Sequence, residues 1–266
     1  MAISCTDLLA GLRAIAPREL EEDWDNGGLQ INMAKKSAEK VLVCLEITEK
    51  VIDEAVDLGA DYIVTHHPLL FHKLDVIDGA TVTGAYVIRL IRHGITVYSA
   101  HTSFDHVFGG NNDYLADLLH LKKVHRLKVW TPLGDKEYAG RVGTLLQPLS
   151  LREVGEKVEE VLGLSSKVRM VGDPERMIKT IGICTGAGGD SLDAAIRNGC
   201  DLFITGDVRH HEAQMAKETG LCIIDAGHYG TESIFARNFA DKLRKATDGM
   251  VEIIESGVVV DPFTID

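Results

Sequence analysis

The chain has 266 residues, of which 45% are hydrophobic and 26% charged, a composition typical of a soluble globular protein with one or two domains. Its 40 acidic residues outnumber 28 basic ones, and the resulting net charge of −12 disfavours sequence-independent binding to nucleic acid. The apolar runs are a few residues long, whereas a membrane-spanning helix needs roughly 20. The N-terminal segment lacks the pattern of a secretory signal and predicts an amphipathic helix that ends near Pro17.

The five cysteines are widely spaced and form no CxxC pair. Cys44, Cys184 and Cys222 fall inside apolar runs typical of strands, where a buried thiol behaves as a small hydrophobic group. We therefore expect a cytoplasmic protein without disulfide bonds and without a thiolate metal site.

The order of predicted elements repeats along the chain. Each copy reads strand, helix, strand, helix, strand, and the heptamers GADYIVT and GCDLFIT mark equivalent points in the two copies. The predicted elements of the first copy cover 41–47, 48–59, 61–65, 82–93 and 95–100. Those of the second copy cover 178–185, 190–198, 201–205, 210–218 and 221–226, preceded by a strand at 140–147 and a helix at 150–162, and followed by a helix at 229–243.

Strands that alternate with helices predict parallel pairing with right-handed crossovers. We therefore expect an α/β fold of two similar lobes, with mostly parallel sheets flanked by helices. The turn-rich stretch from Trp130 to Tyr138 is the expected joint. This assigns 1–130 to the first lobe and 131–266 to the second, which together form one compact fold.

Histidines and acids gather where predicted strands end. His66 and His67 follow the strand that ends at Thr65, and Asp105 follows the one that ends near 100. Ligands of open α/β sheets bind outside the carboxyl ends of the strands. A lone histidine there is usually a surface or capping residue, but a vicinal pair is harder to explain in that way. In an extended backbone the two rings point to opposite sides, which would let them serve two metal ions.

His228 and Glu232 stand four residues apart at the start of the last predicted helix, so both side chains share one face. Such a pair can bind a metal, although an acidic first turn is also what the helix dipole favours. Joined through the repeat with His66, His67 and Asp105, the pair favours a metal site at the strand carboxyl ends between the lobes.

Three imidazoles and two carboxylates, with no sulfur, suit borderline divalent ions such as iron, zinc, manganese, cobalt or nickel. Five ligands are many for one tetrahedral ion and few for two. A dinuclear centre satisfies the count if Glu232 bridges the ions and water fills the open positions. We expect two divalent ions per chain.

A glycine-rich loop, GAGGD, lies between a predicted strand and helix, where the backbone N–H groups of Gly188 and Gly189 could meet a phosphate. The loop lacks a Walker lysine and does not match GxGxxG, so the signal is weak. Arg209 is a second group that could contact a phosphate.

Three further histidines, His101, His210 and His211, also follow strand ends. They are candidates for acid–base roles or for orienting metal ligands, because an imidazole titrates near neutral pH. The competing interpretation is that they satisfy buried polar groups at the interface of the lobes.

Five segments occur together and in order: DNGGLQ, THHPLLF, SAHTSFD, TGDVRHHE and GHYGTES. With them the chain resembles the GTP cyclohydrolase I type 2 homologues, dinuclear-metal-centre proteins also named after an interacting factor of the transcription regulator NGG. The resemblance covers nearly the whole chain. It implies that His66 and Asp105 bind one ion, that His67 and His228 bind the other, and that Glu232 bridges both.

The resemblance also implies a ring-shaped homohexamer whose metals face an internal cavity. Longer members carry an inserted domain between the lobes, and the segment joining the two repeats is too short for it here, so the chain is similar to the short form. The turn signal WDNGG is at least a structural loop, and the resemblance suggests that it lies near the site, where Asp25 or Asn26 could orient a ligand.

Two functions of different classes fit these features. The first is a metal-dependent hydrolase, of GTP cyclohydrolase type or acting on another nucleotide or phosphoester, in which metal-activated water attacks a purine C8 or a phosphoryl group. The second is a non-catalytic metal carrier, sensor or assembly partner that uses the same ligands. Competitive binding of a nucleotide or phosphoester at the metals would distinguish them.

Overall fold

The computed structural model describes residues 2–131 and 134–264. Their contacts divide the chain into two units. Unit 1 comprises residues 1–107 and 235–262, and unit 2 comprises residues 108–234 and 263–266. No helix among the described residues is both long and apolar enough to cross a membrane.

Unit 1 is built on a five-stranded sheet in the order β13-β4-β5-β6-β2. β13, β4, β5 and β6 run parallel, and β2 pairs antiparallel with β6 at the edge. The strands are β1 Ile3–Ser4, β2 Gly28–Ile31, β3 Ser37–Ala38, β4 Lys40–Cys44, β5 Tyr62–Thr65, β6 Thr96–Ser99 and β13 Glu252–Glu255. The helices are α1 Cys5–Ile15, the 3₁₀ turn Arg18–Leu20, α2 Glu49–Leu58, α3 Val82–Arg92, α4 Thr102–His106 and α10 Phe235–Ala246.

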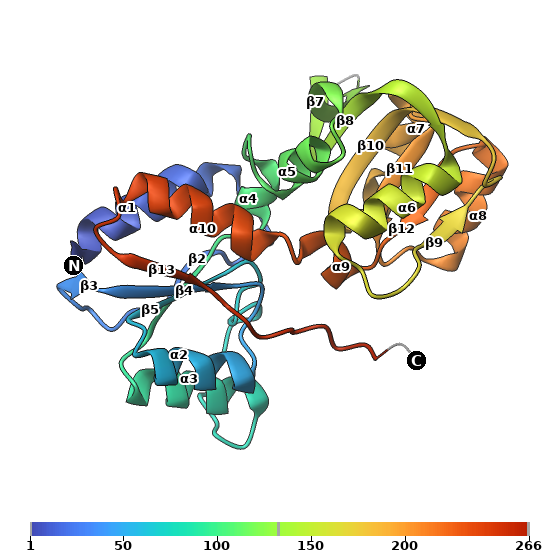
Figure 1. The fold of residues 1–266 in the computed structure, drawn as a ribbon. Helices are drawn as coiled ribbons and strands as arrows, with labels where there is room; N and C mark the ends of the chain where they lie inside the picture. The colour runs from blue at the N-terminus through green and yellow to red at the C-terminus, as the bar shows by residue number, and fades with distance from the viewer. Residues whose placement is uncertain (1, 132–133, 265–266) are drawn as a thin grey trace. The chain divides into compact units, whose positions relative to one another are not determined.

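Helices cover both faces of this sheet: α1 and α10 lie on one face, and α2 and α3 on the other (Figure 1). Because helices cover both faces, β4 and β5 are buried along nearly their whole length. Strands buried on both faces appear in the sequence as nearly continuous apolar runs. α2 begins where the Thr48 hydroxyl accepts the N–H of Val51, and it ends at Gly59, whose φ of 65° is the left-handed conformation that glycine adopts without strain.

Unit 2 contains a six-stranded sheet in the order β7-β8-β10-β11-β12-β9. Only β10, β11 and β12 run parallel; the flanking pairs are antiparallel. The strands are β7 Lys122–Thr131, β8 Gly134–Ser150, β9 Arg169–Val171, β10 Met177–Ala187, β11 Leu202–Gly206 and β12 Cys222–Asp225. The helices are α5 Asn111–Leu118, α6 Leu151–Leu162, the 3₁₀ turn Gly189–Ser191, α7 Leu192–Arg197, α8 His210–Thr219 and α9 His228–Glu232.

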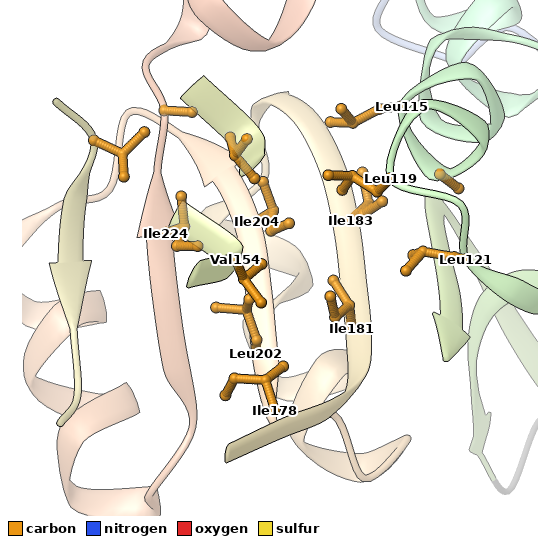
Figure 2. Packing of buried hydrophobic residues seen from close by; sticks show 14 of the residues in the cluster. Leu115, Leu119, Leu121, Val154, Ile178, Ile181, Ile183, Leu202, Ile204 and Ile224 are labelled. Atoms are coloured by element: carbon orange, nitrogen blue, oxygen red, sulfur yellow. The ribbon is translucent and has the colours of Figure 1, made fainter. Parts of the chain in front are cut away.

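Alternation along the central strands separates two cores in unit 2. Leu202 and Ile204 face α5 and α6, whereas Phe203 between them faces the other side with α7 and α8. Figure 2 shows the first of these cores, in which Val154 of α6 lies among Leu202, Ile204 and Ile224, and Leu119, just after α5, lies beside Ile183 of β10. The helix expected at 150–162 is present as α6, whose buried residues include Val154 and Val158.

The expected α/β architecture of helix-flanked sheets is confirmed. The boundaries of the units differ from the lobes 1–130 and 131–266. Residues 108–131 join unit 2, because β7 pairs with β8, and residues 235–262 return to unit 1, because β13 pairs with β4. The expected joint at Trp130 to Tyr138 falls where β7 and β8 pair with each other, and residues 132–133 within it lie outside the described residues.

The single helix expected over 229–243 is two helices. α9 ends at Glu232, and α10 begins at Phe235, with the division between the units falling between Ile234 and Phe235. His228 and Glu232 therefore keep their helical spacing within unit 2, while the rest of the predicted helix packs in unit 1.

Candidate metal centre

In unit 1, His66 and His67 follow β5 and form a donor group with His101, which follows β6. Ring nitrogens of the three lie within 4.8 Å of one another. The N–H groups of His66 and His67 both donate to the carbonyl of Leu45, at 3.0 and 2.9 Å. This irregular end of the strand breaks the alternation of an extended backbone, so the two rings lie 5.2 Å apart instead of pointing to opposite sides as we expected.

The tautomer of His66 is set by a buried hydrogen bond. Its Nδ1 lies 2.8 Å from the carbonyl oxygen of Ala100, and because a carbonyl only accepts, Nδ1 carries the proton. The neutral ring then presents its Nε2 lone pair, which lies 3.7 Å from Oδ1 of Asp105. Two donor atoms that each sit about 2.0–2.2 Å from one ion are themselves roughly 3–4 Å apart. His66 and Asp105 thus have the spacing of two ligands to one metal.

His101 is held by a carboxylate that is shielded from solvent. Its Nδ1 lies 2.8 Å from Oδ1 of Asp25, and Oδ2 of Asp25 accepts from the N–H and the hydroxyl of Thr102 at 3.1 and 2.5 Å. Burial tends to raise the pKa of Asp25, but the bonds from His101 and Thr102 outweigh it and lower the pKa to about 2. Asp25 is therefore ionised near neutral pH and fixes the orientation of the His101 ring.

In unit 2, His228 and Glu232 meet on α9. Nε2 of His228 lies 3.0 Å from Oε2 of Glu232, and Nδ1 of His228 lies 2.7 Å from Oδ2 of Asp207. A histidine that binds a metal through one ring nitrogen is commonly oriented by a carboxylate on the other nitrogen. Asp207 takes that place at Nδ1 of His228, and the Glu232 carboxylate, a candidate metal ligand, lies beside Nε2. The side chain of Glu232 is 4% exposed, so its charge is largely removed from water.

Gly186, at the end of β10, makes room for Glu232. Its φ is +70°, and a Cβ at this position would lie 2.2 Å from Oε1 of Glu232. The hydroxyl of Thr231 accepts the N–H of Gly186 at 2.9 Å, which ties α9 to the end of the strand. Only glycine combines this backbone conformation with so close an approach.

Two residues that contact the donor histidines were not among the site residues expected from the sequence. Asp207 comes directly after β11 and orients His228, and Glu46 comes just after β4 and places Oε2 3.6 Å from Nδ1 of His67. Both follow strand ends, which was a usable signal. Asp207 also has a φ of +54°, a conformation that is uncommon for a residue other than glycine.

The weaker candidates take other contacts. Asn26 donates its side-chain amide to the carbonyl of Leu70, and the N–H of Gly188 donates to the Thr205 hydroxyl at 2.9 Å. Gly189 lies against Glu212, whose carboxylate would meet a Cβ there at 2.2 Å.

Arg209 donates to Glu212 and lies 3.5 Å from Asp190. His210 and His211, exposed at the start of α8, join none of the groups of three donors found among the described residues. Of the histidines considered for acid–base roles, only His101 therefore shares a donor group with His66 and His67.

The cysteine side chains are unsuited to metal binding, because they are buried. All five cysteines are free and buried. Burial raises the pKa of Cys44, and it raises that of Cys200 to about 12, so these groups stay protonated near neutral pH. The donor set consists of imidazoles and carboxylates.

Oriented imidazoles beside carboxylates, at the carboxyl ends of parallel strands in both units, define a two-unit α/β protein with groups that could hold metal ions. The chain belongs to the Duf34/NIF3 (NGG1p interacting factor 3) family, whose family model matches residues 3–262.

Curated relatives named GTP cyclohydrolase 1 type 2 homolog resemble the chain over its length. The protein from Clostridium perfringens is 38% identical over 257 residues, covering 97% of each chain. The protein from Lactococcus lactis subsp. lactis is 36% identical over 261 residues, covering 97% of this chain and 98% of its own. Because both alignments span nearly all of both proteins, these relatives are of the same length class.

Solved structures share the fold. The Bacillus cereus protein related to NIF3 matches with a TM-score of 0.90 at 22% identity and covers 99% of each chain. The structure described as reduced HcgD from Methanocaldococcus jannaschii matches with a TM-score of 0.81 at 28% identity, covering 97% of this chain and 99% of its own.

Proposed function

We propose that the chain is a metal-dependent hydrolase that binds two divalent ions through His66, His67, Asp105, His228 and Glu232. In this assignment His66 and Asp105 would hold one ion, His67 and His228 would hold the other, and Glu232 would be a ligand to both. The observation that carries the proposal is that the hydrogen bonds to Nδ1 of His66 and of His228 each leave Nε2 facing a carboxylate.

The chemistry of the donor set supports a borderline divalent ion such as iron, zinc, manganese, cobalt or nickel. When bound, such ions supply Lewis acidity that polarises a carbonyl or phosphoryl oxygen and makes water nucleophilic near neutral pH. The substrate class that follows is a nucleotide or another phosphoester, in line with the cyclohydrolase name of the curated relatives.

His101 is the group that would move a proton. Asp25 holds Nδ1, as a carboxylate does in a catalytic histidine–aspartate pair, which leaves Nε2 to exchange a proton with substrate or solvent. Replacing Asp25 with Asn should keep the shape of the side chain, but it removes the carboxylate that holds the proton on Nδ1 of His101 and so favours the tautomer protonated on Nε2. We expect kcat to fall by about 10²-fold with little change in KM or metal content.

The metal assignment is tested by metal content of protein purified without an affinity tag, measured by mass spectrometry. Two ions per chain are expected, and Glu232→Gln should lose most of both. Glu212→Gln is a matched control, because Glu212 is also a buried carboxylate in unit 2 but pairs with Arg209. Equal metal content in the two variants would refute the role of Glu232.

Turnover is tested with GTP and a panel of phosphoesters on metal-loaded protein. Hydrolysis that disappears in Glu232→Gln, with the thermal unfolding of the two metal-free proteins unchanged, supports the hydrolase. Two bound ions that exchange rapidly, with no turnover and no competing nucleotide, would instead favour a metal carrier or sensor. The homohexamer implied by the family resemblance is a separate proposal, tested by native mass spectrometry at several protein concentrations.

A further inference from the structure

Two aromatic side chains in unit 1 are exposed beside the donor group. Trp24 is 61% exposed and Phe71 is 44% exposed, and their ring centroids lie 6.0 Å apart. Both rings meet the ring of His101 nearly at right angles, at 6.0 and 6.3 Å. The ring of His101 lies 5.2 Å from that of His66. The aromatic pair therefore stands next to the histidines that could hold a metal.

The segments that carry this pair are fixed to one another. The side-chain amide of Asn26 donates to the carbonyl of Leu70 at 2.5 Å, and Oε1 of Gln30 accepts the N–H of Leu70 at 2.9 Å. Nε2 of Gln30 in turn donates to the carbonyl of Asn26 at 2.6 Å. Leu70 precedes Phe71 and Asn26 lies two residues after Trp24, so these bonds cross-link the two segments.

The hydrogen bonds of Asp25 to His101 and Thr102 add a second anchor, directly beside Trp24. A single exposed apolar ring on a protein surface is common and needs no binding role. Trp24 differs in that the hydrogen bonds of Asp25 and Asn26 fix the segment that carries it, while its ring stays exposed. An aromatic face that is already ordered loses little conformational entropy when a ligand stacks on it.

We propose that Trp24 and Phe71 form a platform beside His101 for a flat nitrogen heterocycle of purine size, which stacks on the face of Trp24 while Phe71, tilted by 56° to that face, packs against the edge of the heterocycle. The inference rests on the proposed function, because it names the part of the substrate that lies next to the metal ligands. An indole face matches a bicyclic ring in size, and stacking requires no charge from the ligand. The platform recognises the ring of a nucleoside, with or without its phosphate.

The chain has two tryptophans, so the substitution Trp130→Phe leaves Trp24 as the sole indole fluorophore. We would titrate this variant, loaded with Zn²⁺ and also metal-free, with guanosine, adenosine and ribose 5-phosphate. Saturable quenching by either nucleoside, and none by ribose 5-phosphate, is expected. Quenching by ribose 5-phosphate as strong as that by the nucleosides would show phosphate recognition and overturn the proposal, as would no quenching by either nucleoside.

Affinity is then measured by equilibrium dialysis on Trp24→Leu and Phe71→Leu in the otherwise unchanged chain. Each should weaken nucleoside binding by about 5- to 150-fold. Phe108→Leu is the matched control, because Phe108 is 69% exposed, belongs to unit 2 and contacts Arg126. Unchanged affinity in Trp24→Leu, or a loss of the same size in the control, would overturn the proposal.

Metal content separates this inference from the proposed function. Trp24→Leu should keep the metal content of the original chain. Nucleoside binding on Trp24 in a protein that binds no metal would leave the platform standing and remove the metal centre. Two bound ions with no nucleoside binding would support the metal centre and overturn the platform. Quenching that depends on protein concentration alone would identify the pair as a contact between copies of the chain and overturn the platform.

Discussion

Gly186→Ala should both strain the backbone and displace a proposed metal ligand, and comparison with a second glycine variant separates the two effects. An L residue at φ +70° costs about 1 kcal/mol more than glycine. The added Cβ would also lie 2.2 Å from Oε1 of Glu232, far inside van der Waals contact, so the carboxylate must move by about an ångström. Displacing a group that positions a metal typically weakens metal affinity by about 10- to 100-fold.

Gly199→Ala supplies the matched control, because Gly199 has a φ of +68° in the same unit and no atom lies within 4 Å of its added Cβ. Both variants should lose about 2–4 °C in Tm when metal-free. Only Gly186→Ala should also weaken metal binding, measured by competition with a chromogenic chelator. Equal metal affinities in the two variants would refute the steric argument at Glu232.

Three further outcomes are expected. The pKa of Asp25 is about 2 in the folded chain, against 3.8 for an unperturbed aspartate, so its stabilisation, about 2 kcal/mol, is present above pH 4 and lost as the pH falls toward 2; urea unfolding of Asp25→Asn should lack this acid dependence. Asp113→Asn removes the carboxylate 2.8 Å from the buried Arg141 and should destabilise by about 3 kcal/mol, whereas adding Arg141→Met should recover part of the loss, as measured by urea unfolding. Ile204→Ala should cost about 2–5 kcal/mol in the same assay, against under 0.5 kcal/mol for Leu146→Ala, because Ile204 is fully buried and Leu146 is 72% exposed.

The parallel cores of both sheets were predictable because their strands are buried on both faces and read as apolar runs. β4, β5 and β11 appear in the sequence in this way, each followed by a helix. The β7–β8 hairpin was harder: β7, the edge strand, is rich in lysine and arginine, and only residues 140–147 of the longer β8 were expected as a strand. The pairing of β13 with β4 joins segments at opposite ends of the chain, and no local pattern encodes it.

For the candidate site, the residue types and their places after strands could be predicted, but their orientations could not. The proton on Nδ1 of His66 depends on the carbonyl of Ala100, a backbone atom that carries no sequence signal. The partner of His228, Asp207, lies after a different strand, and only the parallel pairing of β11 with β12 brings the two strand ends together. Helical periodicity also continues through residues 233 and 234, so it did not reveal where α9 ends.

The return of α10 and β13 to unit 1 has a consequence for synthesis on the ribosome. All but the last few residues of unit 2 emerge before β13 does, so unit 2 can fold while β4 still exposes one open edge. An unpaired edge next to an apolar strand is a template for pairing with other chains. A nascent chain that stalls after residue 234 would present that edge, and its aggregation in translation extracts should fall when a peptide spanning residues 235–262 is supplied in trans.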